Sequence, residues 1–371
     1  MGVLRTYLAL CVVAGHANAS CAPWTLGGMQ AVQVFFIISG FYMQFVLTQK
    51  YRAKSAFYQS RALRIFIPYY LVFGAILVLS LLSGGVTGQW LALEPYVEKP
   101  FLRNDPVGVV FAAATNFTIF GQSLIHFLSG APGGFLRFVN VSHDAPPLWI
   151  YVLIPQAWTI ALELTFYALA PFLAARRTRV LIGILLLSLA ARAGAYLHFG
   201  LAADPWTYRF FPFELALFLI GMLACRFYFF RKARIRIRPP YLLTVAGLLA
   251  WVTGLALATQ ALAEVWGWAW ASWPIYAVAP FGIAYLFAWT SRSALDRFIG
   301  ELSYPIYLIH YFFVQIFAAH GFPAWIPPSL TGEMIMGLSL FAAVIMTTYL
   351  LEPFERWRQR IIASRNHPAH A

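Results

Sequence analysis

The segment LRTYLALCVVAGH, residues 4–16 of this 371-residue chain, carries an arginine and a histidine in an otherwise apolar run. Arg5 and His16 are eleven residues apart, which puts them on nearly the same face of an α-helix and about 16 Å apart along its axis. A histidine held there could act as a general base or carry a transferred group. Helix packing by His16 and a lipid-headgroup contact by Arg5 are the alternatives. The shared face favours the catalytic interpretation.

Two more cations lie close together in FYQSRALRIFIPYY, residues 57–70. Arg61 and Arg64 are three positions apart, so on a helix both guanidinium groups point the same way. Two such forks suit bidentate contact with phosphate, and this spacing therefore predicts a phosphate clamp. The alternative is a pair of ordinary anchors at the cytoplasmic membrane surface.

An acidic side chain interrupts the apolar stretch WTIALELTFYALAP, residues 158–171. A carboxylate inside a membrane span costs a few kcal/mol even on the lenient insertion scale, so Glu163 is expected to have a function or a partner. Tyr167 is its i+4 neighbour, and Trp158 lies just over one turn earlier. The stretch RFFPFELALF contains a second acid, Glu214, for which a structural ion pair with an arginine is the preferred interpretation.

Two further segments carry polar groups that could meet a substrate. In AVQVFFIISGFYM, Ser39 precedes a glycine that lets another backbone approach closely, and simple helix packing is the alternative role. In ELSYPIYLIHYFF, the residues Ser303, Tyr307 and His310 stand at i, i+4 and i+7 and form one polar stripe. Hydrogen bonding between helices and substrate contact remain equally open for this stripe.

The amino-acid composition indicates which class of protein contains these residues. Hydrophobic residues make up 61% of the chain and charged residues only 11%, against roughly 45–50% and about 25% in soluble domains. Apolar runs of membrane-spanning length recur from end to end, and the backbone must satisfy its hydrogen bonds within helices. The sequence therefore predicts an all-α, polytopic transmembrane bundle, and residues 1–371 read as a single membrane-embedded domain.

The net charge of +13 comes from clusters of lysine and arginine between the apolar runs, as the positive-inside rule predicts, and nucleic-acid binding is not expected. This rule gives about ten crossings with both termini cytoplasmic. The segment 107–129 would break the charge pattern as a full crossing, so we expect it to be re-entrant. The expected spans are 3–20, 30–48, 65–83, 150–173, 180–198, 209–228, 241–260, 273–290, 303–320 and 333–351.

Three other patterns bear on the interpretation. Arg5, the apolar run and Ala17–Ala19 imitate a signal peptide with its cleavage site, but another apolar span follows almost at once. Glu352 precedes a proline and indicates a helix boundary. The three cysteines have no regular spacing, and no metal site is expected.

Taken in order, these motifs resemble the acyltransferase 3 family of membrane-bound O-acyltransferases. The resemblance runs from residue 4 to about residue 357. Ala31 and Gln33 stand where the family usually has Gly and often Asp, and the chain shows no appended SGNH-type domain. The matching segments are Arg5 to His16 (R-x10-H), VFFIISGF (FFxxSGF), RALRIFIP (RxxR, then Pro), WTIALELTFY (W-x4-E-x2-FY), LSYPIYLIH (SYxxYLxH) and LEPFERW (E-x-P).

The resemblance implies transfer of an acyl group, commonly acetyl, from cytoplasmic acyl-coenzyme A to a hydroxyl on a glycan or another acceptor. Acetyl-CoA is then a donor substrate and no bound cofactor is expected. Arg61 and Arg64 would hold its phosphates. The residues implied in catalysis are His16, Glu163 and Arg5, with His16 as general base or acyl relay and Glu163 orienting its ring. The residues implied in substrate contact are Ser39, Trp158, Tyr167, Ser303, Tyr307 and His310.

The same resemblance sets the expected surroundings. We expect a multi-pass protein of the cell (inner, cytoplasmic) membrane, in contact with lipids, a glycan or lipid-linked sugar acceptor and glycan-assembly machinery. A transporter or lipid-linked glycan flippase would also need about ten spans and a polar interior, and it is the main rival. A scaffold for a glycan-assembly complex is a third interpretation. The identity of the acceptor, the acyl chain length and the oligomeric state do not follow from the residues.

Overall fold

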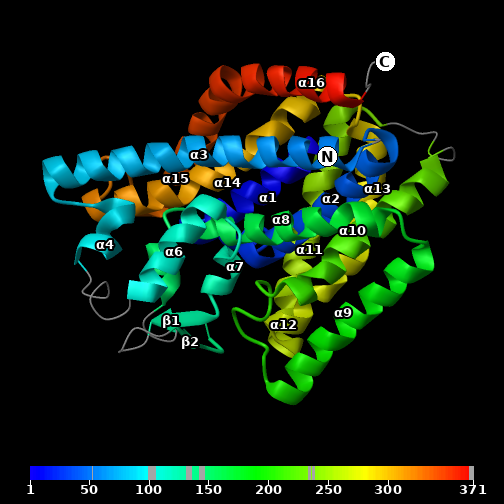
Figure 1. The fold of residues 1–371 in the computed structure, drawn as a ribbon, viewed down its shortest axis with the longest axis horizontal. Helices are drawn as coiled ribbons and strands as arrows, with labels where there is room; N and C mark the ends of the chain where they lie inside the picture. Colours follow the sequence, from blue (N-terminus) through cyan, green and yellow to red (C-terminus); the bar gives the residue numbers. More distant parts are fainter. Residues whose placement is uncertain are drawn as a thin grey trace.

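The computed structural model describes residues 1–51, 53–98, 106–130, 136–141, 147–232, 235 and 239–366, and within them the chain is almost entirely helical (Figure 1). The one sheet of this part is a two-stranded antiparallel hairpin, β1 (Leu128–Gly130) and β2 (Leu136–Phe138). The helices are α1 (Gly2–His16), α2 (Gly28–Gln49), α3 (Lys54–Thr87), α4 (Glu94–Glu98), α6 (Pro106–Thr118), α7 (Gln122–Ile125), α8 (Trp158–Ala174), α9 (Thr178–Phe199), α10 (Phe211–Arg231), α11 (Tyr241–Trp266), α12 (Trp268–Ala271), α13 (Trp273–Thr290), α14 (Ala294–His320), α15 (Thr331–Ile345) and α16 (Glu352–Asn366).

The all-α expectation is confirmed, and each expected span contains a helix, although α8 begins only at Trp158 and α1 ends at His16. Eight helical segments in the described part are long and apolar enough to cross a membrane. The remaining two expected spans are also helices: α13, and α1, which has only 15 residues and is thus about 22 Å long. A hydrocarbon core of about 30 Å needs roughly 17–25 residues, so α1 reaches across only part of it.

The last span differs from a simple crossing. Its helix α15 passes into a π-helical stretch, Met346–Leu351, and α16 begins directly afterwards at Glu352. The helix boundary expected at Glu352 is therefore wrong: the chain stays helical through this residue, and only the type of helix changes there. The basic loop at 226–238 lies partly outside the described residues.

The segment 107–129 folds as two short helices, α6 and α7, followed by the start of β1. The 13 residues of α6 extend about 20 Å, which is too short to cross a bilayer. The irregular backbone after α6 is covered by protein, since Asn116 donates to the carbonyl of Tyr151 and accepts from the amide of Leu153. This arrangement has the form expected of a re-entrant segment.

Small residues let the central helices approach closely. A Cβ atom added at Gly40 on α2 would lie 1.9 Å from the carbonyl oxygen of Phe218 on α10, and one added at Gly221 would lie 1.9 Å from that of Ile37. Membrane helices associate mainly through such close packing, because lipid tails are as apolar as the side chains. The α2–α10 contact therefore fixes where α2 lies along α10, and with it the position of Ser39.

The helices that bear the predicted site residues form the middle of the bundle. Helix α1 packs against both α2 and α14, and α2 also packs against α8. Figure 1 shows α3, α14 and α15 as neighbours on one side of the molecule, while α9, α11 and α12 lie on another. Residues distant in sequence thus converge where α1, α2, α3, α8 and α14 meet.

Candidate active site

A cavity of about 910 Å³ lies among α1, α2, α3, α8, α14 and α16. This volume is in the range of about 300–1,000 Å³ that is usual for small-molecule sites. One end, here called the basic mouth, is lined by the cations Lys50, Arg61, Arg64, Arg297 and Arg356 together with the acids Asp296, Glu301, Glu352 and Glu355. Uncharged polar groups and one acid line the other end, called the inner end: Ser39, Thr159, Glu163, Tyr167 and Tyr307. Along α2 and α14 the two ends are 10 or 11 residues apart, or about 15 Å.

The two arginines of the predicted clamp have different surroundings. Arg64 donates to both carboxylate oxygens of Glu301, at 2.7 and 2.9 Å. Arg61 lines the cavity, and the structure gives it no ion pair among the described residues. Its buried Nε atom has no hydrogen-bond partner there either. Arg61 is therefore the more available cation of the two.

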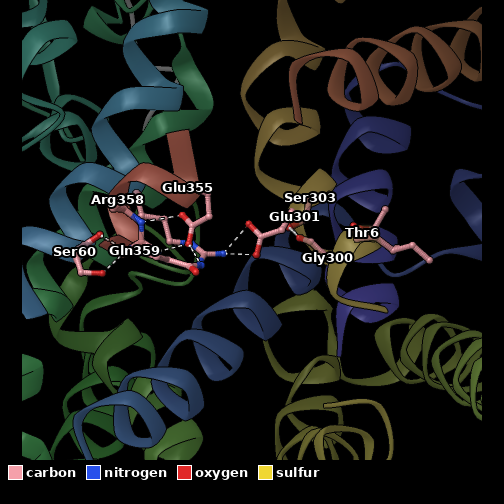
Figure 2. A network of polar contacts seen from close by, with 10 residues as sticks. Thr6, Ser60, Gly300, Glu301, Ser303, Glu355, Arg358 and Gln359 are labelled. Carbon is pink, nitrogen blue, oxygen red and sulfur yellow. Dashed lines mark hydrogen bonds and ion pairs between the residues drawn. The ribbon is translucent and has the colours of Figure 1, made fainter. Parts of the chain in front are cut away.

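Glu301 belongs to a polar network at the basic mouth that the sequence analysis did not find (Figure 2). In this network Arg358 binds the carboxylate of Glu355 and donates to both the carbonyl and the hydroxyl of Ser60. Figure 2 shows Glu301 and Glu355 in one network of polar contacts, and both carboxylates act electrostatically on Arg64. A charged residue near a helix end suggested only a surface anchor, so the sequence held no signal for this network.

Arg5 also lines the cavity, on the wall formed by α1 and α14. A Cβ atom on Gly300 of α14 would lie only 2.7 Å from the Cα atom of Gly2 on α1, so glycine at this position lets the two helices approach closely. Within the described residues Arg5 takes part in no ion pair. Arg5 and Arg61 are therefore two guanidinium groups of the cavity lining that belong to no ion pair of the described residues.

Glu163 accepts two hydrogen bonds at the inner end of the cavity. The hydroxyl groups of Ser39 and Tyr167 both donate to its Oε1 atom at 2.6 Å. The ion pairs of the described residues do not include Glu163. This places three predicted site residues in one cluster, on α2 and α8, that faces the cavity. The second carboxylate oxygen has no hydrogen bond from the described residues.

His16 has a ring partner that the sequence analysis assigned to a different role. Its Nδ1 atom is 2.8 Å from Nε2 of His310, and Nδ1 of His310 is 2.9 Å from the carbonyl oxygen of Tyr307. The edge of the Tyr311 ring packs against the His16 ring, with centroids 5.6 Å apart. The hydrogen bonds of Glu163 go to α2 and to its own helix, so Glu163 does not orient the His16 ring by direct contact.

The polar stripe of α14 is divided between the cavity and the histidine pair. Ser303 and Tyr307 line the cavity, but the Ser303 hydroxyl donates to the backbone carbonyl of Gly300 at 2.7 Å. The Tyr307 hydroxyl donates to the carbonyl of Gln156 and lies 2.9 Å from the Thr159 hydroxyl. The rings of Tyr307 and His310 have centroids 5.9 Å apart. Tyr307 thus stands between the inner end of the cavity and the histidine pair.

Trp158 belongs to a separate cluster outside the cavity lining. The Arg209 guanidinium lies 4.4 Å from the centroid of its ring and 4.6 Å from that of Tyr208. The same guanidinium donates to both carboxylate oxygens of Asp204 and contacts Nε2 of His126. Burial raises the pKa of the Tyr208 hydroxyl to about 12, so this group stays protonated at neutral pH. Arg209 lay outside the basic clusters of the sequence, and this isolation was the one signal that could have drawn attention to it.

The second intramembrane acid is structural, as predicted. Glu214 is fully buried and forms an ion pair with Arg192. Gln33 donates to both of its oxygens at 3.1 and 3.2 Å, and the Tyr276 hydroxyl donates to Gln33 in turn. Within the described ranges, no three His, Cys, Asp or Glu side chains converge in a way that could hold a metal ion.

Fold and site together define a multi-pass helical bundle whose cavity runs from a basic mouth to Tyr307. Next to Tyr307 lie the buried His310 and its ring partner His16, which is exposed, and neither histidine lines the cavity itself. The chain belongs to the acyltransferase 3 family, because the model of that family, described as an acyltransferase domain, matches residues 1–352. This membership makes it a multi-pass membrane acyltransferase. Comparisons with curated proteins and with solved structures give no match.

Proposed function

We propose that this protein transfers an acyl group, most simply acetyl, from cytoplasmic acyl-coenzyme A to a hydroxyl of a cell-surface or exported glycan. The observation that carries the proposal is the course of the cavity. It begins among cations and ends at Tyr307, whose backbone carbonyl contacts His310, the ring partner of His16; the two histidines lie just outside the cavity lining. A donor with an anionic head and a reactive far end fits such a cavity.

The charges of the cavity support coenzyme A as the donor. Its phosphates would bind at the basic mouth, where Arg61 offers a guanidinium group that belongs to no ion pair of the described residues and Arg5 adds a second charge further along the wall. Arg64 can contribute only in competition with Glu301, to which it is already bonded. The acyl thioester would then lie toward the inner end, near Ser39 and Glu163.

The transfer itself needs a group that accepts the proton of the attacking hydroxyl. As the acceptor oxygen bonds to the acyl carbon, the carbon–sulfur bond breaks and the coenzyme leaves as a thiolate. His16 would take the hydroxyl proton and return it to the sulfur, a contribution of about 10²–10⁴-fold. In a two-step route His16 would first carry the acyl group itself. Both routes require the thioester to pass Tyr307.

This activity places the protein in the cell (inner, cytoplasmic) membrane with both termini cytoplasmic, so that the basic mouth faces the coenzyme. Its partners are acyl-coenzyme A, membrane lipids and a glycan or lipid-linked sugar, and it would work beside glycan-assembly machinery. Nucleic acid has no part in this reaction. The acyl donor is a substrate and leaves as free coenzyme after each turnover.

A variant of the histidine tests the proposal in cells. In the producing strain, His16→Ala is expected to abolish ester-linked acetate on the surface glycan, while the glycan itself stays at its normal level. Ester-linked acetate is measured by NMR of the purified glycan. The matched control is His198→Ala, which removes an exposed histidine near the end of α9 and should leave the acetate unchanged.

Two other outcomes would contradict the proposal in different ways. Normal acetate in the His16→Ala strain would remove the catalytic role of His16. Loss of the glycan itself would favour a lipid-linked glycan flippase over an acyltransferase acting on that glycan.

A further inference from the structure

The proton positions of the histidine pair follow from its surroundings. Nδ1 of His310 is 2.9 Å from the carbonyl oxygen of Tyr307, and a carbonyl can only accept a hydrogen bond. Nδ1 of His310 therefore carries a hydrogen. Its other nitrogen, Nε2, is 2.8 Å from Nδ1 of His16, so only one of these two facing atoms holds a proton.

Burial decides which atom that is. His310 is completely buried, and neither histidine takes part in an ion pair among the described residues. A second proton on His310 would make it an uncompensated cation inside a helical bundle, which costs several kcal/mol. His310 is therefore neutral, its Nε2 accepts, and Nδ1 of His16 donates.

The ring geometry agrees with a directed hydrogen bond. The two imidazole planes differ by only 5°, and the ring centroids are 5.1 Å apart although the facing nitrogens are 2.8 Å apart. Rings with these separations lie end to end in nearly one plane, which aligns the N–H of one with the lone pair of the other. The ring of Tyr311 closes one side of His16.

We propose that His310 is a positioning residue that holds His16 in the Nδ1–H tautomer, so that Nε2 of His16 is the atom that meets the substrate. This inference rests on the proposed acyl transfer and names the reactive atom within it. His310 fills the place that a carboxylate fills in a Ser-His-Asp triad, but without a negative charge. It accepts from Nδ1 both before and after Nε2 takes the proton of the attacking hydroxyl. The proton then leaves Nε2 for the coenzyme sulfur, and His310 ends unchanged.

Two substitutions at position 310 separate positioning from packing. His310→Phe keeps an aromatic ring but removes the acceptor, whereas His310→Gln keeps an amide oxygen that can accept from Nδ1 of His16. We expect kcat to fall about 10²–10⁴-fold in His310→Phe, with little change in KM for acetyl-CoA, and to recover largely in His310→Gln. The pH at which kcat is half-maximal should move in His310→Phe and return toward the native value in His310→Gln.

The assay uses the full-length purified protein in lipid nanodiscs, with acetyl-CoA as donor and membranes of a strain lacking the protein as acceptor. Coenzyme release that depends on the acceptor membranes tests the proposed function by itself, and its absence in the native protein would reject that function. If the native protein is active and His310→Phe keeps its kcat and pH profile, the positioning role is rejected while the function stands.

A spectroscopic measurement covers the case in which His310→Phe does not fold. Solid-state NMR of native protein labelled with ¹⁵N-histidine should show that His16 and His310 are both neutral imidazoles protonated at Nδ1. The signal of His16 is identified by its disappearance in His16→Ala. A neutral His16 protonated at Nε2 would overturn the inference, as would a doubly protonated His310.

Discussion

The two intramembrane glutamates have similar sequence surroundings and opposite environments. Glu214 is fully buried, paired with Arg192 and held by Gln33, and it lies outside the cavity lining. Glu163 lines the cavity, accepts only from the hydroxyls of Ser39 and Tyr167, and has no cation in the described ion pairs.

The difference shows how a bundle can use the same costly group in two ways. A carboxylate in a membrane span is tolerated when an opposite charge and hydrogen bonds compensate it, and Glu214 has both. Glu163 has hydrogen bonds but no paired cation, and its side chain lines the cavity. We therefore interpret Glu214 as a structural group and Glu163 as a group kept for the reaction.

Breaking the Glu214 ion pair should give the largest effect, and the effect should be on stability. Glu214→Leu leaves Arg192 as a buried unpaired charge, which costs about 3–5 kcal/mol. The matched control is the double variant Arg192→Met/Glu214→Leu, which removes both charges and should regain most of the loss. Thermal unfolding of the purified protein measures both, and equal destabilisation of the two variants would contradict a compensated pair.

Glu163→Gln should show the opposite pattern, with most of its effect on turnover. The amide keeps the shape of the side chain and an oxygen for the two hydroxyl donors, so the midpoint of thermal unfolding should change little. The loss of charge at the inner end should lower kcat about 10²-fold, a change of about 2.7 kcal/mol. Acceptor-dependent release of coenzyme from acetyl-CoA measures it. Native turnover in a folded Glu163→Gln protein would place Glu163 with Glu214 among the structural acids.

A matched pair of tyrosines should give the smallest effects. Tyr167→Phe removes one donor to Glu163, and Tyr276→Phe removes the donor to Gln33 beside Glu214. We expect Tyr167→Phe to lower kcat about tenfold, because one hydrogen bond to a charged group contributes about 1.5–3 kcal/mol. Tyr276→Phe should lower the unfolding midpoint by a few degrees and leave kcat unchanged. If Tyr276→Phe lowers kcat as much as Tyr167→Phe, the functional distinction between the two clusters fails.

The sequence predicted the fold well because membrane helices are specified locally. Each expected span contains a helix, since an apolar run in a bilayer can satisfy its backbone only within itself. The pattern of charges predicted that 107–129 is not a full crossing, and the helix found there has only 13 residues, too few to cross a bilayer. The helix end expected at Glu352 from the following proline was wrong, because a proline in the first turn of α16 is compatible with a helix that continues from the π-helical stretch before it.

The site was predicted less completely, because hydrogen-bond partners come from different helices. Spacing put Tyr167 near Glu163, and the structure confirms this contact within one helix. Spacing could not show that Ser39 completes the cluster or that Arg64 is bonded to Glu301, 237 residues away. Nor could it separate Arg61, which is available, from Arg64, which is not.

For the opening pair, the sequence by itself determined that Arg5 and His16 share a helix face, because an α-helix repeats every 3.6 residues. It also determined that few charges would lie in the spans, and where. Only the tertiary structure decided which of them are neutralised and which face the cavity. Helices α1 and α14 bring together residues that are 294 positions apart, and this contact pairs His16 with His310 rather than with Glu163. A ring nitrogen 2.8 Å away determines where a proton resides, and no pattern of local spacing contains that distance.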